Sequence, residues 1–143
     1  MKIAIGSDHG AYELKQELIG YLTEKGYELD DKGCHSTASC DYPVFAKAVA
    51  EDVAAGKADR GIVLCTTGIG VSITANKVAG IRCALCHNEH TAQMTRLHND
   101  SNVLAMGAAE LTPTLAKRIA DIWLETEFSG EEKHARRISQ IEG

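Results

Sequence analysis

The sequence is poor in proline, in long apolar runs and in basic residues. It has 2 prolines and 13 glycines in 143 residues, which excludes Pro-rich and collagen-like chains. No stretch approaches the roughly 18 consecutive apolar residues of a membrane-spanning helix, so we expect no membrane contact. The 15 Lys and Arg are outnumbered by 20 Asp and Glu, which gives a formal net charge of −5. Because nucleic-acid binders present a basic face, we expect no nucleic-acid partner.

The residues that are present indicate one folded domain over 1–143. Hydrophobic residues make up 44% and charged residues 24% of the chain, which is typical of globular proteins. A chain of this length buries about 68–70% of its unfolded surface and needs no disulfide or metal to fold. The N-terminus reaches Asp8 before the apolar core of a signal peptide could form, so we expect a cytoplasmic protein. The 5 cysteines are then expected as free thiols.

The apolar pattern predicts alternating strands and helices. Short apolar or alternating stretches predict strands over 2–6, 27–30, 61–65, 81–85 and 103–106. Helical spacing predicts helices over 12–26, 45–56, 70–78, 89–98, 115–123 and 131–142, with a polar loop over 31–43. Repeated strand–helix–strand units form parallel sheets with helices on both faces. The expected fold class is α/β: a single doubly wound, Rossmann-like domain with a five-stranded parallel sheet.

Ligands in such folds bind where the carboxyl ends of the strands meet helix N-termini, and residues 65–72 have that position. The segment Cys-Thr-Thr-Gly-Ile-Gly-Val-Ser follows an apolar strand and opens a helix, so its backbone N–H groups can bind an anion. It is not a Walker A loop, because the Gly-Lys-Ser/Thr ending is missing, and not a dinucleotide fingerprint, because Ile73 occupies the third glycine position. Either it is a tight turn with a buried structural thiol, or the helix N-terminus favours the Cys65 thiolate as a base or nucleophile.

Two further polar groups lie at the ends of expected elements. Asp8 and His9 follow the first strand, at the expected binding edge of the sheet. Alternatively, Asp8 is the N-cap of the first helix and His9 is a surface residue. His98-Asn99-Asp100 ends the fourth helix, either as a polar cap or as part of a catalytic group.

The charged last helix, over 131–142, allows two interpretations. Lys133 and Arg137 are four residues apart and therefore share one helix face. They are either solvated and balanced by Glu131 and Glu132, or they form a phosphate clamp in which Arg137 is the bidentate donor. Because the helix has few apolar residues with which to pack on its own domain, we expect it to dock on a partner subunit.

Cys83, Cys86 and His87 match the pattern of c-type haem attachment. Residues three apart on a strand point to opposite faces, so the two cysteines cannot hold one haem or one metal ion together. We therefore expect buried apolar thiols here, neither a redox pair nor a metal site.

Several motifs, in their order along the chain, resemble one known family. They are Ile5-Gly6-Ser7-Asp8-His9-Gly10, Asp41-Tyr42-Pro43, Gly61-Ile62-Val63-Leu64-Cys65 with Gly68-Ile69-Gly70, Ser72-Ile73-Thr74-Ala75-Asn76-Lys77, Gly80-Ile81-Arg82, and His98-Asn99-Asp100-Ser101-Asn102-Val103-Leu104-Ala105. Together they cover essentially the whole chain. The set resembles the type B ribose-5-phosphate isomerases, which are grouped with galactose-6-phosphate and allose-6-phosphate isomerases.

The resemblance implies an aldose–ketose isomerase that acts on a phosphorylated sugar through a cis-enediolate, with no metal and no cofactor. It implies Cys65 as the base that moves a proton between C2 and C1, with His98 and Thr67 moving protons during ring opening. The implied substrate-binding residues are Asp8, His9, Thr66, Gly68, Ile69, Gly70, Asn99, Lys133 and Arg137. Of these, Asn99 and the Gly68–Gly70 turn would hold the enediolate oxygen. Asp8 would contact sugar hydroxyls, and His9, Lys133 and Arg137 would lie near the phosphate.

The resemblance also implies a homodimer or homotetramer whose active sites take residues from two subunits. The expected reaction interconverts ribose 5-phosphate and ribulose 5-phosphate. Thr66 stands where the family usually has glycine, and Lys133 and Ala109 stand where it usually has arginine. The alternative within the family is therefore an allose-6-phosphate or galactose-6-phosphate isomerase. A small-molecule-binding α/β module without turnover is the alternative outside it.

Overall fold

The computed structural model describes all residues, 1–143. One sheet contains β1 (Lys2–Ser7), β2 (Glu28–Gly33), β3 (Arg60–Cys65), β4 (Cys83–Leu85) and β5 (Val103–Gly107), all parallel. The helices are η1 (His9–Ala11, a 3-10 turn), α1 (Tyr12–Glu24), α2 (Tyr42–Ala54), α3 (Ile69–Asn76), α4 (Glu89–Asn99), α5 (Pro113–Glu125) and α6 (Glu132–Glu142). The α/β class and the five-stranded parallel sheet expected from the sequence are confirmed.

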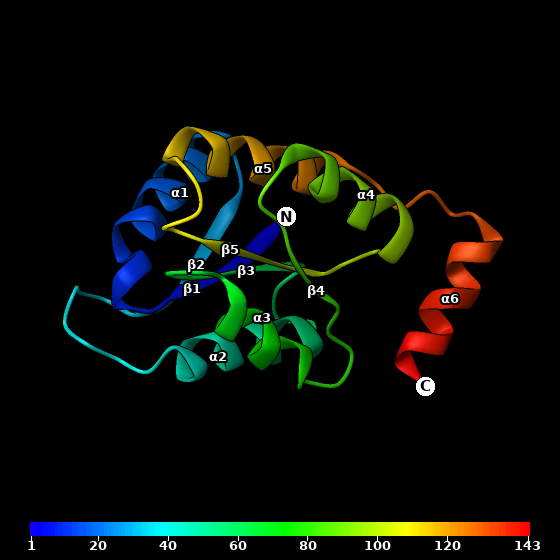
Figure 1. Cartoon of the computed structure of the whole chain (residues 1–143), viewed down its shortest axis with the longest axis horizontal. Coiled ribbons are helices and arrows are strands. Elements are labelled where there is room, and N and C mark those ends of the chain that lie inside the picture. Colours follow the sequence, from blue (N-terminus) through cyan, green and yellow to red (C-terminus); the bar gives the residue numbers. More distant parts are fainter.

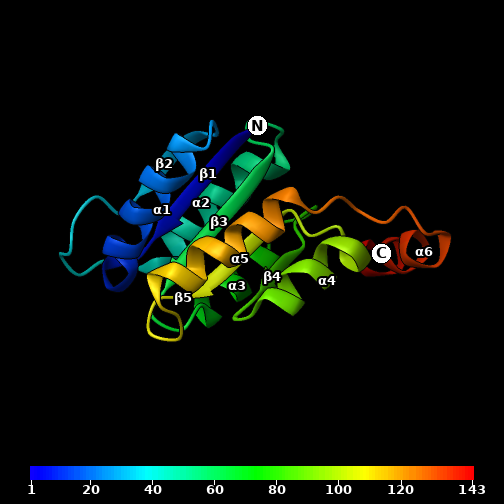
Figure 2. The ribbon, with the colours of Figure 1, turned by 90° about the horizontal axis from the view of Figure 1, so that it is seen from above.

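The strands lie in the order β2-β1-β3-β5-β4 (Figure 2). From β1 the chain first moves outward to β2 and then crosses back to β3, so the connections after β1 and β3 leave in opposite directions. Such a reversal opens a crevice at the carboxyl ends of the two strands. These ends are adjacent, because Ser7 of β1 is in register with Leu64 of β3.

Helices cover both faces of the sheet (Figure 1). The side chains of each strand alternate between the two faces, as a pleated strand requires. Ile5 and Leu64 belong to a cluster with α1, α4 and α5, in which Trp123 is fully buried. Val63 and Cys65 belong to the second cluster, with α2 and α3. Burial of each large apolar side chain contributes about 1.5–3 kcal/mol, so both layers fix the strand ends that carry the site.

Most element boundaries differ by one to three residues from the sequence-based prediction, and the changes at β2, α2 and β4 have identifiable consequences or causes. β2 extends to Gly33 and α2 begins at Tyr42, which shortens the expected polar loop. Pro43 is accommodated in the first turn of α2, where its missing N–H leaves no hydrogen bond unmade. β4 begins at Cys83 rather than at residue 81, because the Arg82 N–H donates to the side chain of Asn102 at 2.8 Å instead of to a neighbouring strand.

α6 lies to the side of the two helical layers, next to the end of α4 (Figures 1 and 2). Its one buried residue is His134. A short connection over 126–131 links it to α5. None of the helices is both long enough and apolar enough to cross a lipid bilayer.

Candidate active site

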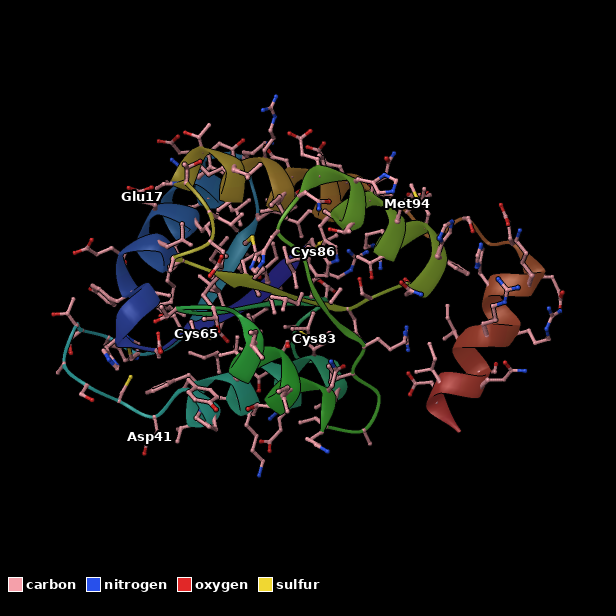
Figure 3. The ribbon with its side chains drawn as sticks, viewed as in Figure 1. Glu17, Asp41, Cys65, Cys83, Cys86 and Met94 are labelled. Carbon is pink, nitrogen blue, oxygen red and sulfur yellow. The ribbon has the colours of Figure 1, made fainter.

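A cavity of about 430 Å³ opens at the carboxyl ends of β1 and β3, where the strand order predicts ligand binding. Its lining comes from the end of β1, the β3–α3 turn, and the helices α2 and α3: Asp8, Tyr42, Cys65, Thr66, Thr67, Ile69, Gly70 and Ile73. Figure 3 shows Cys65 at the end of the sheet, next to the start of α3. All of these residues except Tyr42 and Ile73 belong to the site set named from the sequence.

The Cys65 thiol is held by backbone amides of the turn that follows it. Cys65 is 5% exposed, and its Sγ accepts a hydrogen bond from the Gly68 N–H at 3.1 Å. The next amide, that of Ile69, donates to Thr67 Oγ1 at 3.3 Å. Amides at a helix N-terminus carry partial positive charge and favour negative charge nearby. The sulfur is thus buried, faces the cavity, and lies next to the backbone amides that begin α3.

The turn depends on two glycines: Gly68 within it and Gly107 at the end of β5. Gly68 has a φ of +78°, and a Cβ on it would lie 2.6 Å from Leu85 Cδ1 and 2.8 Å from the Met106 carbonyl carbon. A Cβ on Gly107 would lie 2.4 Å from the carbonyl carbon of Thr67. The β3–α3 turn therefore packs directly against the end of β5, which fixes the position of its N–H groups.

Asp8 caps a helix and also lines the cavity, so it occupies both of the positions considered for it. Its Oδ1 accepts a hydrogen bond from the Ala11 N–H at 3.1 Å, so the carboxylate caps η1. Its own N–H donates to Leu64 O at 3.2 Å, which joins the end of β1 to β3. The side chain is buried except where it lines the cavity, and Oδ2 makes no hydrogen bond within the chain. One carboxylate oxygen is therefore free to accept a hydrogen bond from a ligand hydroxyl.

His9 lies beside Asp8 but outside the cavity lining. The Cys40 N–H donates to His9 Nδ1 at 3.2 Å, so in the neutral ring the proton is on Nε2. The ring is exposed, and Nε2 is left as a donor on the rim of the site.

Besides Ile73 of α3, the sequence-based prediction missed Tyr42 as a residue of the cavity. It was placed in a loop, whereas it forms the first residue of α2 and is 39% exposed. Gly70 leaves the space for its ring, because a Cβ on Gly70 would lie 2.5 Å from Tyr42 Cε1 and Cζ. The signal that could have revealed it is Pro43, since proline is common in the first turn of a helix.

Comparisons with known proteins give the family. The family model described as Ribose/Galactose Isomerase matches residues 3–141. The chain is 46% identical over 140 residues to the ribose-5-phosphate isomerase B of Escherichia coli, covering 98% of this chain and 93% of that protein. The chain belongs to the ribose/galactose isomerase family. It is also 51% identical over 142 residues to a putative sugar phosphate isomerase of Bacillus subtilis, covering 99% of this chain and 95% of the relative.

A solved structure of the ribose/galactose isomerase family has the same fold. The ribose-5-phosphate isomerase B of Clostridium thermocellum superposes with a TM-score of 0.97 at 52% identity, covering 99% of this chain and 95% of that one. Membership of this family identifies the chain as an isomerase, as the motifs suggested.

Four residues implied by the family resemblance lie away from the cavity in the same chain: His98, Asn99, Lys133 and Arg137. His98 and Asn99 lie near the amino ends of the strands, and the other two lie on α6. Cys65 is in register with Gly107 at one end of β5, whereas Asn99 precedes Val103 at the other end. Four residue steps of about 3.3 Å separate these ends, or roughly 13 Å. The Lys133 and Arg137 side chains on α6 are exposed, and neither lines the cavity. One isomerase chain therefore assembles Cys65, Thr67 and Asp8, but not His98, Asn99, Lys133 or Arg137, around this cavity.

The thiols of Cys83 and Cys86 are separated by the sheet. Cys83 packs with the α2–α3 cluster and Cys86 with the opposite cluster, and Figure 3 shows them on the two sides of the strands. The expected opposite orientation is confirmed. Burial raises the pKa of both thiols, to about 11 for Cys86, so both stay protonated at neutral pH. No group of three or more His, Cys, Asp or Glu is arranged to hold a metal ion.

Proposed function

We propose that the protein interconverts ribose 5-phosphate and ribulose 5-phosphate, with Cys65 as the general base. The observation that carries the proposal is the Cys65 sulfur, 3.1 Å from the Gly68 N–H in the cavity that Asp8 also lines. Proton abstraction beside a carbonyl needs a base and nearby donors for the developing negative charge. The β3–α3 turn offers both within a few residues.

The reaction begins from the open-chain aldose. The Cys65 thiolate removes the proton from C2, the C–H electron pair forms a C1–C2 double bond, and the carbonyl oxygen O1 becomes negatively charged. The thiol then returns the proton to C1 while the hydroxyl proton of O2 moves to O1, which leaves the carbonyl at C2. The base is regenerated, so the steps balance without a metal or cofactor.

The other roles follow the family resemblance and the positions of the side chains. The Gly68–Gly70 turn, together with Asn99, stabilises the enediolate oxygen. Asp8 accepts hydrogen bonds from sugar hydroxyls through its free Oδ2. His98, with Thr67, moves protons during ring opening, while Thr66 and Ile69 form the wall of the cavity.

The phosphate group would be bound by His9, Lys133 and Arg137. Lys133 forms an ion pair with Glu131 at 3.7 Å, whereas Arg137 makes no ion pair within the chain and has its guanidinium free. Arginine binds phosphate with two parallel hydrogen bonds, so Arg137 is the main phosphate ligand in this proposal.

His98, Asn99, Lys133 and Arg137 lie away from the cavity of their own chain. We therefore propose a homodimer in which the partner's α4 and α6 complete the cavity. The surface offers apolar contacts for such an arrangement. Ile69 and Ile73 beside the cavity are 51% and 56% exposed, and Ile141 of α6 is 61% exposed. A larger groove of about 770 Å³ runs between the β4 edge and α6. Apolar residues that are exposed together mark interaction surfaces.

The alternative substrates are allose 6-phosphate and galactose 6-phosphate. A coupled assay that compares these with ribose 5-phosphate at equal concentrations tests the proposal. We expect the highest kcat/KM with ribose 5-phosphate. A higher kcat/KM with either hexose phosphate would make the protein a hexose-phosphate isomerase, and absence of turnover with all three would overturn the proposal.

A further inference from the structure

His134 is the buried residue of the otherwise exposed helix α6, and it lies flat against His98 of α4. The two ring centroids are 4.2 Å apart and the ring planes differ by 19°. His134 is 8% exposed, whereas His98 is exposed. The stack thus covers one face of the His98 ring and leaves its edge open.

Neither ring nitrogen of His98 has a hydrogen-bond partner within the chain, in contrast to His9, whose Nδ1 is fixed by the Cys40 N–H. The stack therefore contacts the His98 ring by its face and not by a nitrogen. An imidazole that moves protons needs a nitrogen free to exchange the proton and a fixed orientation. A stacked neighbour meets both needs, because it contacts the ring face without occupying a nitrogen.

α6 has a second attachment to the body of the protein that does not involve the stack. The Arg82 guanidinium forms an ion pair with Glu142 at 2.7 Å and donates to Asn99 O at 2.9 Å and Asp100 O at 2.8 Å. The far end of α6 is thereby attached to the end of α4. Loss of the His134 ring alone leaves this attachment in place.

Burial and the positive charges nearby favour the neutral form of the His134 ring. Burial lowers the pKa of His134, and so do His98, Lys133 and Arg137, while the Glu131 carboxylate, 3.6 Å from Nε2, acts in the opposite direction. These groups come from α4 and from α6 with the residue before it, the elements packed around the ring. A neutral ring can remain stacked whether or not His98 carries a proton, whereas two charged rings would repel each other.

We propose that His134 is a positioning residue for His98: its ring holds the His98 imidazole in the orientation in which His98 moves protons during ring opening. This inference rests on the proposed function, in which His98 has that role. A competing explanation is that His134 only anchors α6, and hence Lys133 and Arg137. The two differ in the kinetic constant they affect, because a positioning residue acts on kcat and an anchor of the phosphate ligands acts on KM.

The test measures kcat and KM with ribose 5-phosphate for His134→Ala and His134→Phe, each with His98 present and with His98→Ala. Glu142→Ala serves as the control that breaks the other attachment of α6. We expect His134→Ala to lower kcat by about 10- to 100-fold with KM within about 2-fold, the size of effect that a misplaced group produces. His134→Phe keeps a flat ring and should retain kcat within about 3-fold.

The double variants separate this inference from the proposed function. If His134 acts through His98, His134→Ala causes no further loss once His98 is alanine. A raised KM with unchanged kcat, or a loss that is additive with His98→Ala, would overturn the positioning role. If His98→Ala itself leaves kcat unchanged in an active enzyme, the proposed role of His98 fails and the positioning role fails with it. If His98→Ala lowers kcat and His134→Ala does not, the positioning role alone is wrong.

Discussion

A single thiol without a side-chain partner carries the chemistry proposed here. Cys65 Sγ receives a backbone N–H and no histidine or carboxylate hydrogen-bonds to it. This differs from nucleophilic cysteines that depend on a neighbouring histidine. The amides at the start of α3 lie next to the sulfur instead, so the role proposed for this residue depends on the turn that follows it.

Replacing Cys65 by alanine should remove turnover and leave the fold intact. The site is at the end of a buried strand that an alanine fits, and general-base catalysis contributes about 10²- to 10⁴-fold, so kcat should fall at least that far. Cys65→Ser should be similarly impaired, because an alcohol is too weak an acid to supply the base near pH 7. Steady-state kinetics and circular dichroism measure the two effects.

The control for this prediction is Cys86→Ala. It removes another buried thiol, one that does not line the cavity, so kcat should stay close to that of the unmodified protein. Near-normal turnover in folded Cys65→Ala would contradict the assignment of the base.

Single residues also show how far the site could be predicted. Asp8, Cys65, Thr66 and Thr67 follow strands, and the position of strand ends is fixed by the fold class, so sequence pattern was sufficient to bring them together. Tyr42 was missed because its place depends on a neighbour without a side chain, Gly70, which no periodicity reveals.

At the scale of secondary-structure elements, the periodicity predicted every strand and α-helix, but neither the 3-10 turn η1 nor the order of the strands in the sheet. β5, rather than β4, pairs with β3, since the register joins Cys65 to Gly107. Such pairing depends on contacts between segments that are distant in sequence, and neither periodicity nor propensity contains them. The boundary errors have local causes, namely Pro43 within α2 and the side chain of Asn102 that holds the amide before β4.

The β3–α3 turn should be far less tolerant of a methyl group than a helix interior. In Gly68→Ala, the new Cβ meets Leu85 and the Met106 backbone at under 3.0 Å and the residue keeps a φ of +78°, so we expect loss of stability by about 1–3 kcal/mol and loss of turnover. Thermal unfolding and kinetic assays measure both.

Gly20→Ala is the matched control for Gly68→Ala. Gly20 lies within α1, and a Cβ there meets no atom within 4 Å. Alanine in a helix interior is more favourable than glycine by roughly 0.5–1 kcal/mol, so this variant should gain stability and keep its activity. A Gly68→Ala enzyme as active as Gly20→Ala would show that the turn geometry is not needed for catalysis.

The helix α6 gives a prediction about phosphate binding. Arg137→Ala should raise KM for ribose 5-phosphate more than it lowers kcat, because the phosphate is bound about equally in the ground state and the transition state. Loss of one charged hydrogen-bonding partner costs about 1.5–3 kcal/mol, or about 10- to 150-fold in KM. Arg136→Ala is the control, since Arg136 is already paired with Glu132 at 2.9 Å. Equal KM values for the two variants would contradict the phosphate role.

At the scale of the whole molecule, the two groups of site residues lie at opposite edges of one sheet. β3 ends at Cys65, the proposed base, and α4 ends at His98 and Asn99, with roughly 13 Å of β5 between those two ends of the sheet. Within one chain they cannot contact the same small sugar. Two copies related by a two-fold axis would place the Cys65 end of each chain against the His98 end of its partner. A two-fold interface of this kind forms two equivalent sites.

Mixing two impaired variants tests this arrangement. Cys65→Ala and His98→Ala should each retain only a small fraction of the original activity when assayed alone, a loss of about 10²-fold or more. In a dimer that contains one chain of each kind, one site combines the intact Cys65 of one chain with the intact His98 of the other. Random pairing of equal amounts places both intact residues in about a quarter of the sites, so about a quarter of the original activity should return after subunit exchange.

The matched control mixes Cys65→Ala with the double variant Cys65→Ala, His98→Ala, in which no chain has an intact base, and activity should stay absent. The exchange itself is checked by mass spectrometry of the assembled chains. If exchange is complete and the first mixture remains inactive, the site is formed within one chain. The loss of activity in His98→Ala would then have a cause other than ring opening in this cavity, whose lining does not include His98.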